Sequence, residues 1–224
     1  MFSLYVIADR GVFSDDQAWL DALRTLGSAI GRSPATALQV RVKNEPPARR
    51  AELLASARSA LGPVTANTLL NGSLTEALCL GFGGVHWPEA MIPERRPAGL
   101  PTRFVVGASI HSREALQRAE RADATFALFG PVFAPGTKPV AGQGIDALAG
   151  IVRDARLPLL AVGGITPVRV RACIAAGAAG VGVVTGILLA PEPLRAMAAY
   201  AEVLHANRVA GRYPRPDPVP GSRR

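Results

Sequence analysis

The chain has 224 residues, of which 49% are hydrophobic, 19% charged and 5% aromatic, as in an ordinary globular domain. No apolar run reaches the roughly 20 residues that a membrane helix needs, so no membrane association is expected. The formal net charge is +8, but +4 of it (five arginines less one aspartate) falls in the last 17 residues. This distribution argues against nucleic acid as a partner, because the folded part would carry no concentrated basic face.

Strand-like and helix-like segments alternate along the whole chain. The expected strands are Leu4–Asp9, Ala37–Val42, Val64–Leu70, Gly84–Trp87, Phe104–Ser109, Thr125–Val132, Leu159–Gly164 and Val181–Thr185. The expected helices are Asp15–Ile30, Ala48–Leu61, Leu74–Leu80, Glu114–Ala122, Ile145–Asp154, Pro167–Ala176 and Glu192–Ala206. Ser73, Ser112 and Thr166 are predicted N-caps, whereas the prolines between 91 and 103 leave room for little more than one helical turn. Strict alternation predicts a parallel sheet covered by helices.

Eight such units predict a single α/β domain, a (β/α)8 TIM barrel, over residues 1–207. An open, doubly wound sheet is the alternative. It would favour a GxGxxG turn after the first strand, and the chain has Ala8-Asp9-Arg10-Gly11 there. Residues 208–224 are rich in arginine and hold four prolines, so they are predicted to form a disordered tail.

The two cysteines bear on the cellular compartment. Cys79 and Cys173 lie far apart in apolar helical patterns and match no metal or redox spacing, so both are expected to be buried thiols. The chain begins almost directly in a strand, without a secretory signal pattern. A cytoplasmic protein is therefore expected.

Polar side chains on the second strand point to a ligand. Gln39, Arg41 and Lys43 occupy alternate positions, hence one face, between apolar neighbours. Inside a barrel such side chains are costly unless they bind a ligand or one another, and a solvent-facing edge is the alternative.

The ends of the last two strands are rich in glycine. In a barrel of this kind the loops after strands 7 and 8 commonly hold a phosphate group, and glycine lets the backbone approach an anion closely. Gly163, Gly164, Val184 and Thr185 stand at these ends. The long loop after the sixth strand carries Lys138, and it is either a lid over an anionic ligand or an ordinary surface loop.

In combination, these segments resemble the thiamine phosphate synthase / TenI family over residues 4 to about 205. The resemblance rests on the segments Leu4–Asp9, Leu38–Lys43, Asn71, Gly84–His86, Gly107–His111, Gly130–Phe133, Thr137–Lys138 and Gly144, and on both glycine-bearing strand ends. It implies an enzyme that joins hydroxymethylpyrimidine pyrophosphate to a thiazole phosphate, with small phosphorylated substrates as its partners.

The resemblance also implies roles for individual residues. The pyrimidine pyrophosphate would contact Gln39, Arg41, Lys43 and Asn71, and the leaving pyrophosphate would be held by Ser109, Thr137 and Lys138. The thiazole phosphate would lie against Gly163, Gly164, Val184 and Thr185, and Gly144 would be a further substrate-binding residue. His111 is a further candidate catalytic residue, with a structural role at a strand end as its alternative, and the same two alternatives apply to His86.

The chain departs from the family pattern at the catalytic groups. Synthases bind Mg²⁺ through an aspartate directly after the strand 3 asparagine and through another after strand 4. The first position is Gly72 here, and the second aspartate is missing, so Mg²⁺ binding is expected to be weakened. Glu89 is the nearest replacement ligand, or else a plain helix-start glutamate.

Three functions therefore stay open. The leading one is the synthase, because the basic set suits a pyrophosphate. The second is a metal-free TenI-type thiazole tautomerase, although the histidine expected after strand 6 is Pro131 here, as in synthases. The third is a catalytically weak binder of thiamine-pathway phosphates. The sequence leaves open whether the chain forms a homo-oligomer.

Overall fold

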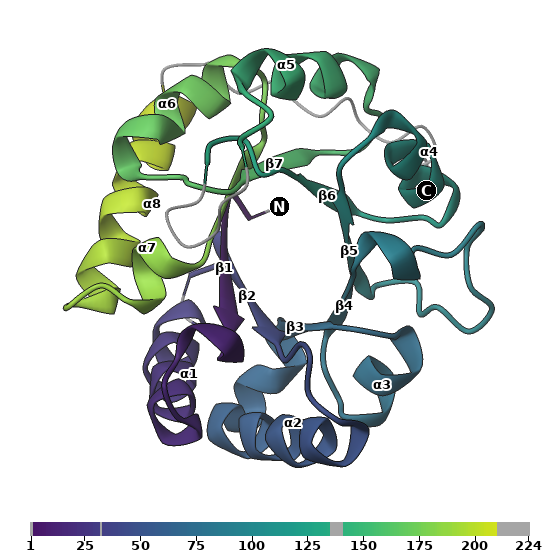
Figure 1. Cartoon of the computed structure of the whole chain (residues 1–224), viewed down its shortest axis with the longest axis vertical. Coiled ribbons are helices and arrows are strands. Elements are labelled where there is room, and N and C mark those ends of the chain that lie inside the picture. The colour runs from purple at the N-terminus through teal and green to yellow at the C-terminus, as the bar shows by residue number, and fades with distance from the viewer. Residues whose placement is uncertain (1, 32, 135–140, 210–224) are drawn as a thin grey trace, which may run out of the picture.

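The computed structural model describes residues 2–31, 33–134 and 141–209. In this part of the chain eight parallel strands pair in sequence order and close into a barrel, with β1 between β2 and β8. The strands are β1 (Leu4–Asp9), β2 (Thr36–Arg41), β3 (Thr68–Asn71), β4 (Gly84–Trp87), β5 (Val105–Ile110), β6 (Phe126–Phe129), β7 (Leu159–Val162) and β8 (Gly180–Val183). The strands form an inner ring and the helices an outer one (Figure 1). The predicted TIM barrel is confirmed.

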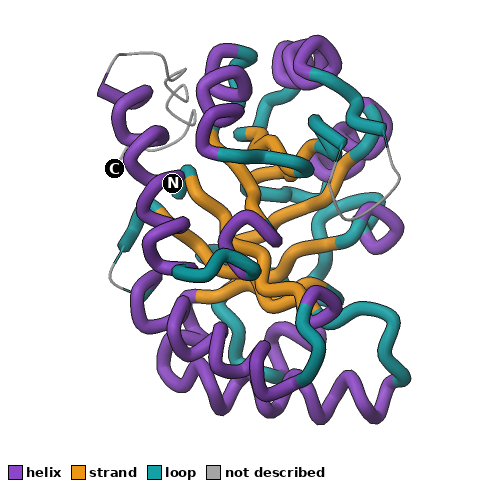
Figure 2. Tube along the Cα trace, turned by 60° about the vertical axis from the view of Figure 1, so that its left-hand side comes forward, coloured by secondary structure: helices purple, strands orange, loops and turns teal. Residues whose placement is uncertain are grey.

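The helices cover the outside of the strands, as Figure 2 also shows. They are α1 (Asp16–Ile30), α2 (Pro47–Leu61), α3 (Leu74–Cys79), α4 (Arg113–Arg121), α5 (Ile145–Asp154), α6 (Pro167–Ala175), α7 (Thr185–Leu188) and α8 (Pro193–Val209). Between β4 and β5 the chain forms only the 3-10 turn η3 (Glu89–Met91), as the prolines predicted. Helix α8 continues two residues past the predicted domain end at 207, and the rest of the predicted tail, from 210, lies outside the described residues.

Side-chain caps begin several of these helices. Ser73 accepts a hydrogen bond from the backbone N–H of Glu76, and Ser112 accepts one from Ala115, as expected of N-caps. Thr166 occupies the N-cap position of α6 but its side chain makes no capping bond. Pro167 follows at the first helical position, where its fixed φ favours the helix and its missing N–H costs nothing.

Four strands differ from their predicted bounds by two residues or more at one end, each for a local reason. Residues Gly62–Asn67 form the 3-10 turn η2 instead of the start of β3, because Gly62 has a positive φ and a proline follows it. Strand β6 ends before Gly130-Pro131, where proline offers no N–H to the ladder. Strands β7 and β8 end two residues early, at the positive-φ glycines 163 and 164 and at the start of α7.

Apolar side chains form two cores. The larger lies between the strands and the helices, and the smaller fills the barrel itself. The barrel cluster consists of Tyr5, Ile7, Ala37, Leu69, Phe126, Leu128 and Leu160. These residues occupy alternate strand positions, so the same faces carry the polar side chains nearer to the carboxyl ends. Cys173 is buried as predicted, but Cys79 is exposed at the end of α3, which corrects that expectation.

Candidate active site at the carboxyl ends of the strands

A hydrogen-bonded relay crosses the barrel interior above the apolar cluster. The Gln39 amide donates to the Tyr5 hydroxyl at 3.0 Å, and that hydroxyl lies 3.4 Å from Nδ1 of His86. Nε2 of His86 lies 2.9 Å from the Ser109 hydroxyl. Because an amide nitrogen can only donate, the relay is satisfied in one direction: Tyr5 donates to Nδ1, and Nε2–H donates to Ser109. The Ser109 hydroxyl proton is then free to bond a ligand.

The relay is electrically neutral at physiological pH. His86 is 1% exposed, and this burial, with a smaller contribution from the charge of Arg41, lowers its pKa to about 3. Burial also raises the pKa of Tyr5 far above its usual value, against a smaller opposing effect of the Gln39 hydrogen bond. The interior therefore supplies donors and acceptors but no mobile charge.

The buried neutral histidine predicts how stability depends on pH. Between pH 6.5 and pH 3 the unfolded chain binds a proton at His86 that the folded chain does not. The free energy of unfolding should therefore fall as the pH is lowered through this interval, by up to about 1.4 kcal/mol per pH unit from this group. Urea unfolding at several pH values gives the slope of the unfolding free energy against pH. This slope should be smaller in His86→Gln than in the wild type by the amount that corresponds to about one bound proton. Equal slopes would contradict a buried neutral His86.

The three polar residues predicted on the second strand run from the barrel interior to its rim. Gln39 is buried in the relay, Arg41 is half-buried and pairs with the Asp9 carboxylate on β1, and Lys43 is exposed. Gln39 and Arg41 thus bond to residues on β1, whereas Lys43 is free to bind an anion at the open carboxyl end of the barrel, which we call the mouth. The alternative of a solvent-facing edge is wrong for Gln39 and Arg41.

Asn71 and Gly72 lie at the neighbouring strand end and are both buried. The Asn71 amide and the Gly72 N–H both reach the His86 carbonyl oxygen, at 3.4 and 3.1 Å. Asn71 is thereby aligned beside the relay. Helix α2 contributes a residue that the sequence analysis missed: the Arg50 guanidinium donates to the carbonyl oxygens of Val42 and Asn71.

Glu89 and His111 face each other across the ends of β4 and β5. Oε2 of Glu89 lies 3.9 Å from Nε2 of His111, and it has no hydrogen-bond partner among the described residues. Arg118 of α4 donates to the Glu89 carbonyl oxygen at 2.8 Å. Nδ1 of His111 lies 2.5 Å from the carbonyl oxygen of Gly130 on the next strand end. This histidine therefore sits directly beside the Gly130-Pro131 segment.

The glycines after β7 are closely packed against the segment that follows β6. Gly163 and Gly164 have φ values of 95° and 59°, a region that side-chain-bearing residues adopt with strain. A Cβ at Gly164 would lie 2.8 Å from the Ala134 carbonyl oxygen and 2.9 Å from Cβ of Phe133. Val184 and Thr185 stand at the adjacent end of β8, where Thr185 begins α7. The backbone at Gly163 and Gly164 can thus lie this close to the segment after β6 only because these residues have no side chains.

Of the three remaining candidates, the structure places only Gly144. Gly144 lies at the start of α5, and its N–H donates to the Val132 carbonyl oxygen at 2.9 Å. Thr137 and Lys138 lie outside the described residues. The structure accordingly brings Gln39, Arg41, Asn71, Ser109 and His111 to one end of the barrel, while the assignments of Thr137 and Lys138 stay predictions.

A metal site of the expected kind does not fit these residues. Within residues 2–31, 33–134 and 141–209 no three histidine, cysteine or carboxylate side chains are grouped so that they could hold a metal ion. Glu89 faces a histidine rather than a second carboxylate. Mg²⁺ prefers oxygen ligands, so this donor set is a poor one for it.

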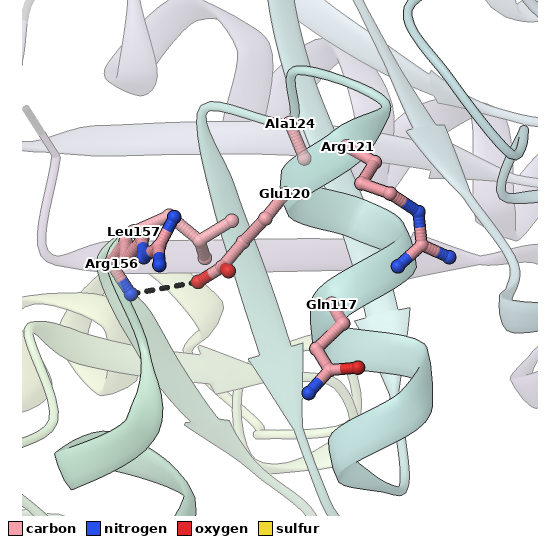
Figure 3. A pocket seen from close by; sticks show the side chains of 6 residues that line it. All are labelled: Gln117, Glu120, Arg121, Ala124, Arg156 and Leu157. Carbon is pink, nitrogen blue, oxygen red and sulfur yellow. Dashed lines mark hydrogen bonds between the residues drawn. The ribbon is translucent and has the colours of Figure 1, made fainter.

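A hollow in the surface lies away from these residues. It has a volume of about 540 Å³ and is lined by α4 and by the turn before β7, at the opposite end of the barrel (Figure 3). Glu120 bridges it by accepting a hydrogen bond from the Arg156 backbone. It holds none of the predicted site residues.

No helix in the described ranges is long and apolar enough to cross a membrane.

Comparisons with known proteins show the family of the chain. A family model described as thiamine monophosphate synthase matches residues 4–187. The thiamine-phosphate synthase of Roseiflexus sp. (strain RS-1) is 35% identical over 210 residues, which cover 90% of this chain and 84% of that protein. The thiamine-phosphate synthase of Methanoculleus marisnigri is 32% identical, with 94% and 99% covered. In fold, the thiamine phosphate pyrophosphorylase of Pyrococcus furiosus matches with a TM-score of 0.67 and 24% identity, covering 92% and 96%.

Proposed function

Because the chain belongs to the thiamine monophosphate synthase family, we propose that it is a transferase of thiamine biosynthesis. It joins hydroxymethylpyrimidine pyrophosphate to a thiazole phosphate: the bond from the methylene carbon to the pyrophosphate breaks, and the thiazole nitrogen bonds that carbon. The observation that carries the proposal is the neutral relay ending at Ser109, with Arg41 and Lys43 above it.

The relay suits the pyrimidine half of the reaction. Departure of pyrophosphate leaves a carbocation-like pyrimidine, and a buried imidazolium beneath it would repel that charge. His86 is neutral at physiological pH and turns its N–H toward Ser109, so Ser109 is free to donate to the departing pyrophosphate. Lys43 and Lys138 would hold the same charge as it develops at the mouth.

The glycine-bearing strand ends suit the thiazole phosphate. Backbone N–H groups near Gly163, Gly164, Val184 and Thr185 would bind the phosphate oxygens, in the position where barrels of this architecture commonly hold phosphate. Gly144 would border the same site from α5. The nitrogen of a thiazole anchored there would face the pyrimidine bound over the relay.

Mg²⁺ is the cofactor that the family implies. The glycine at position 72 and the contact of Glu89 with a histidine leave a poor set of oxygen ligands for it among the described residues. No step of the proposed reaction is therefore assigned to a metal. The charge of the leaving group falls to the protein's own cations.

The placement of His111 favours a second candidate, a TenI-type thiazole tautomerase. His111 lies against Gly130, beside the position where a tautomerase would carry its histidine, and Glu89 faces its outer nitrogen. Such a pair can move a proton on a bound thiazole phosphate without a metal.

A coupling assay separates these functions. The protein is mixed with both phosphorylated substrates, with and without Mg²⁺, and thiamine phosphate is followed by chromatography, while the thiazole tautomer alone is followed by its absorbance. We expect the wild-type protein to form thiamine phosphate and the Ser109→Ala variant to lose this activity. Conversion of the tautomer alone, lost in His111→Ala, would favour the tautomerase. Binding without either product would leave a phosphate binder and overturn the enzyme assignment.

A further inference from the structure

Arg50 of α2 ties together the ends of two strands that the candidate site uses. Its Nη1 donates to the carbonyl oxygen of Val42, directly before Lys43, and its Nη2 donates to that of Asn71 at 2.9 Å. Nε and Nη2 also form a two-point ion pair with Glu76 of α3, at 2.9 and 2.8 Å. Four of the five guanidinium N–H groups are thereby engaged, in a planar arrangement that lysine could not reproduce.

The same ion pair fills the space beside Gly72. A Cβ built on Gly72 would lie 2.6 Å from Oε2 of Glu76 and 2.8 Å from Nη2 of Arg50, both closer than real Cβ contacts. Both side chains are less than one-third exposed and are fixed by their bonds to each other and to the strand ends. A side chain at position 72 and the ion pair therefore compete for one place.

We propose that the Arg50–Glu76 pair replaces a divalent cation at this end of the barrel. It organises the ends of β2 and β3, sets Lys43 and Asn71 in place as a positioning element, and makes pyrophosphate binding independent of Mg²⁺. The inference rests on the proposed function, because it concerns how the same site holds the pyrophosphate.

Charges around the site agree with this inference. A carboxylate at position 72 is what a metal would need there, and the glycine instead leaves room for a guanidinium already neutralised by Glu76. Of the nearby carboxylates, Asp9 is paired with Arg41 and Glu89 faces His111. Among the described residues at the ends of β2 and β3, Lys43 has no carboxylate partner and can offer its positive charge to an anion, and its backbone follows the carbonyl that Arg50 holds.

The first test measures the affinity for inorganic pyrophosphate by calorimetry, with Mg²⁺ and with EDTA. We expect the two dissociation constants to agree within about threefold. In Arg50→Lys the affinity should fall at least about tenfold under both conditions, because a point charge cannot hold two carbonyls and a carboxylate together. Binding that requires Mg²⁺ would overturn the inference and leave the synthase proposal standing. No binding under either condition would overturn the pyrophosphate site itself.

The second test needs no ligand and separates position 72 from turnover. Gly72→Asp should lower the melting temperature and gain no Mg²⁺ binding, because its side chain displaces the pair. Adding Glu76→Ala to Gly72→Asp should restore the melting temperature, since the new carboxylate can take the place of the one removed. Gly72→Ala is the matched control for the Cβ alone. Additive losses in the double variant, or Mg²⁺ binding by Gly72→Asp alone, would contradict the proposal.

Discussion

Replacing Gly164 by valine is expected to abolish binding of the thiazole phosphate, with a loss of affinity of about 100-fold or more. The valine Cβ would meet the Ala134 carbonyl oxygen at 2.8 Å, so the backbone that we propose to bind the phosphate would have to move away from the segment after β6. The φ of 59° adds strain for any side chain. We therefore expect the free energy of unfolding to fall as well, by about 2–4 kcal/mol.

Gly81 offers a matched control for this change. It also has a positive φ, of 73°, but a Cβ there would meet nothing within 4 Å, and the residue lies between α3 and β4, away from the strand ends in question. Gly81→Val should lose only the strain energy, about 1 kcal/mol or somewhat more, and keep its phosphate affinity. The readout is calorimetric binding of the thiazole phosphate beside urea unfolding. Gly164→Ala serves if the valine variant does not fold. Unchanged phosphate affinity in both Gly164 variants would remove this residue from the site.

The sequence predicted the parts of this molecule that depend on periodicity. Alternation of strands and helices determines a barrel because each apolar strand must be covered on its outer face. The alternation within the second strand placed Gln39 and Arg41 on the inner face, which the structure confirms. The same alternation could have predicted that Tyr5 faces the barrel interior, since it shares a strand face with Ile7 and Asp9. A tyrosine in an apolar run is, however, interpreted as part of the core until its hydrogen-bond partners are known.

Other features depend on contacts between distant segments and had no local signal. Arg50 and Glu76 each read as ordinary surface charges of amphipathic helices, and only the meeting of α2 and α3 makes them a pair. From the sequence, Gly72 indicated only a missing aspartate. In the structure, the Arg50–Glu76 pair occupies the space that a side chain at position 72 would need. The strand ends were misplaced by one to four residues because the turns there depend on glycine φ values and on proline, which compete with an apolar run.

Ser109→Ala is expected to lower the rate of thiamine phosphate formation by about 100- to 1,000-fold, the loss typical of removing one donor to a developing negative charge. The reason is specific to the relay. Tyr5 donates its hydroxyl proton to His86, and His86 donates its N–H to Ser109, so the Ser109 hydroxyl proton is the one left for a ligand. The alanine also leaves the N–H of buried His86 without its acceptor, so stability should fall by about 1–3 kcal/mol. A loss of turnover therefore needs a control of similar stability.

Ser112 provides that control three residues further on. It caps α4 by accepting from the Ala115 N–H, and Ser112→Ala should cost about 1 kcal/mol without touching the relay. Initial rates at saturating substrate, beside urea unfolding of both variants, decide the matter. Because Ser109 acts on the departing pyrophosphate, its loss should appear in kcat more than in KM. Equal rates in the two variants would mean that Ser109 only supports the fold and that the leaving group is held by the cations at the mouth.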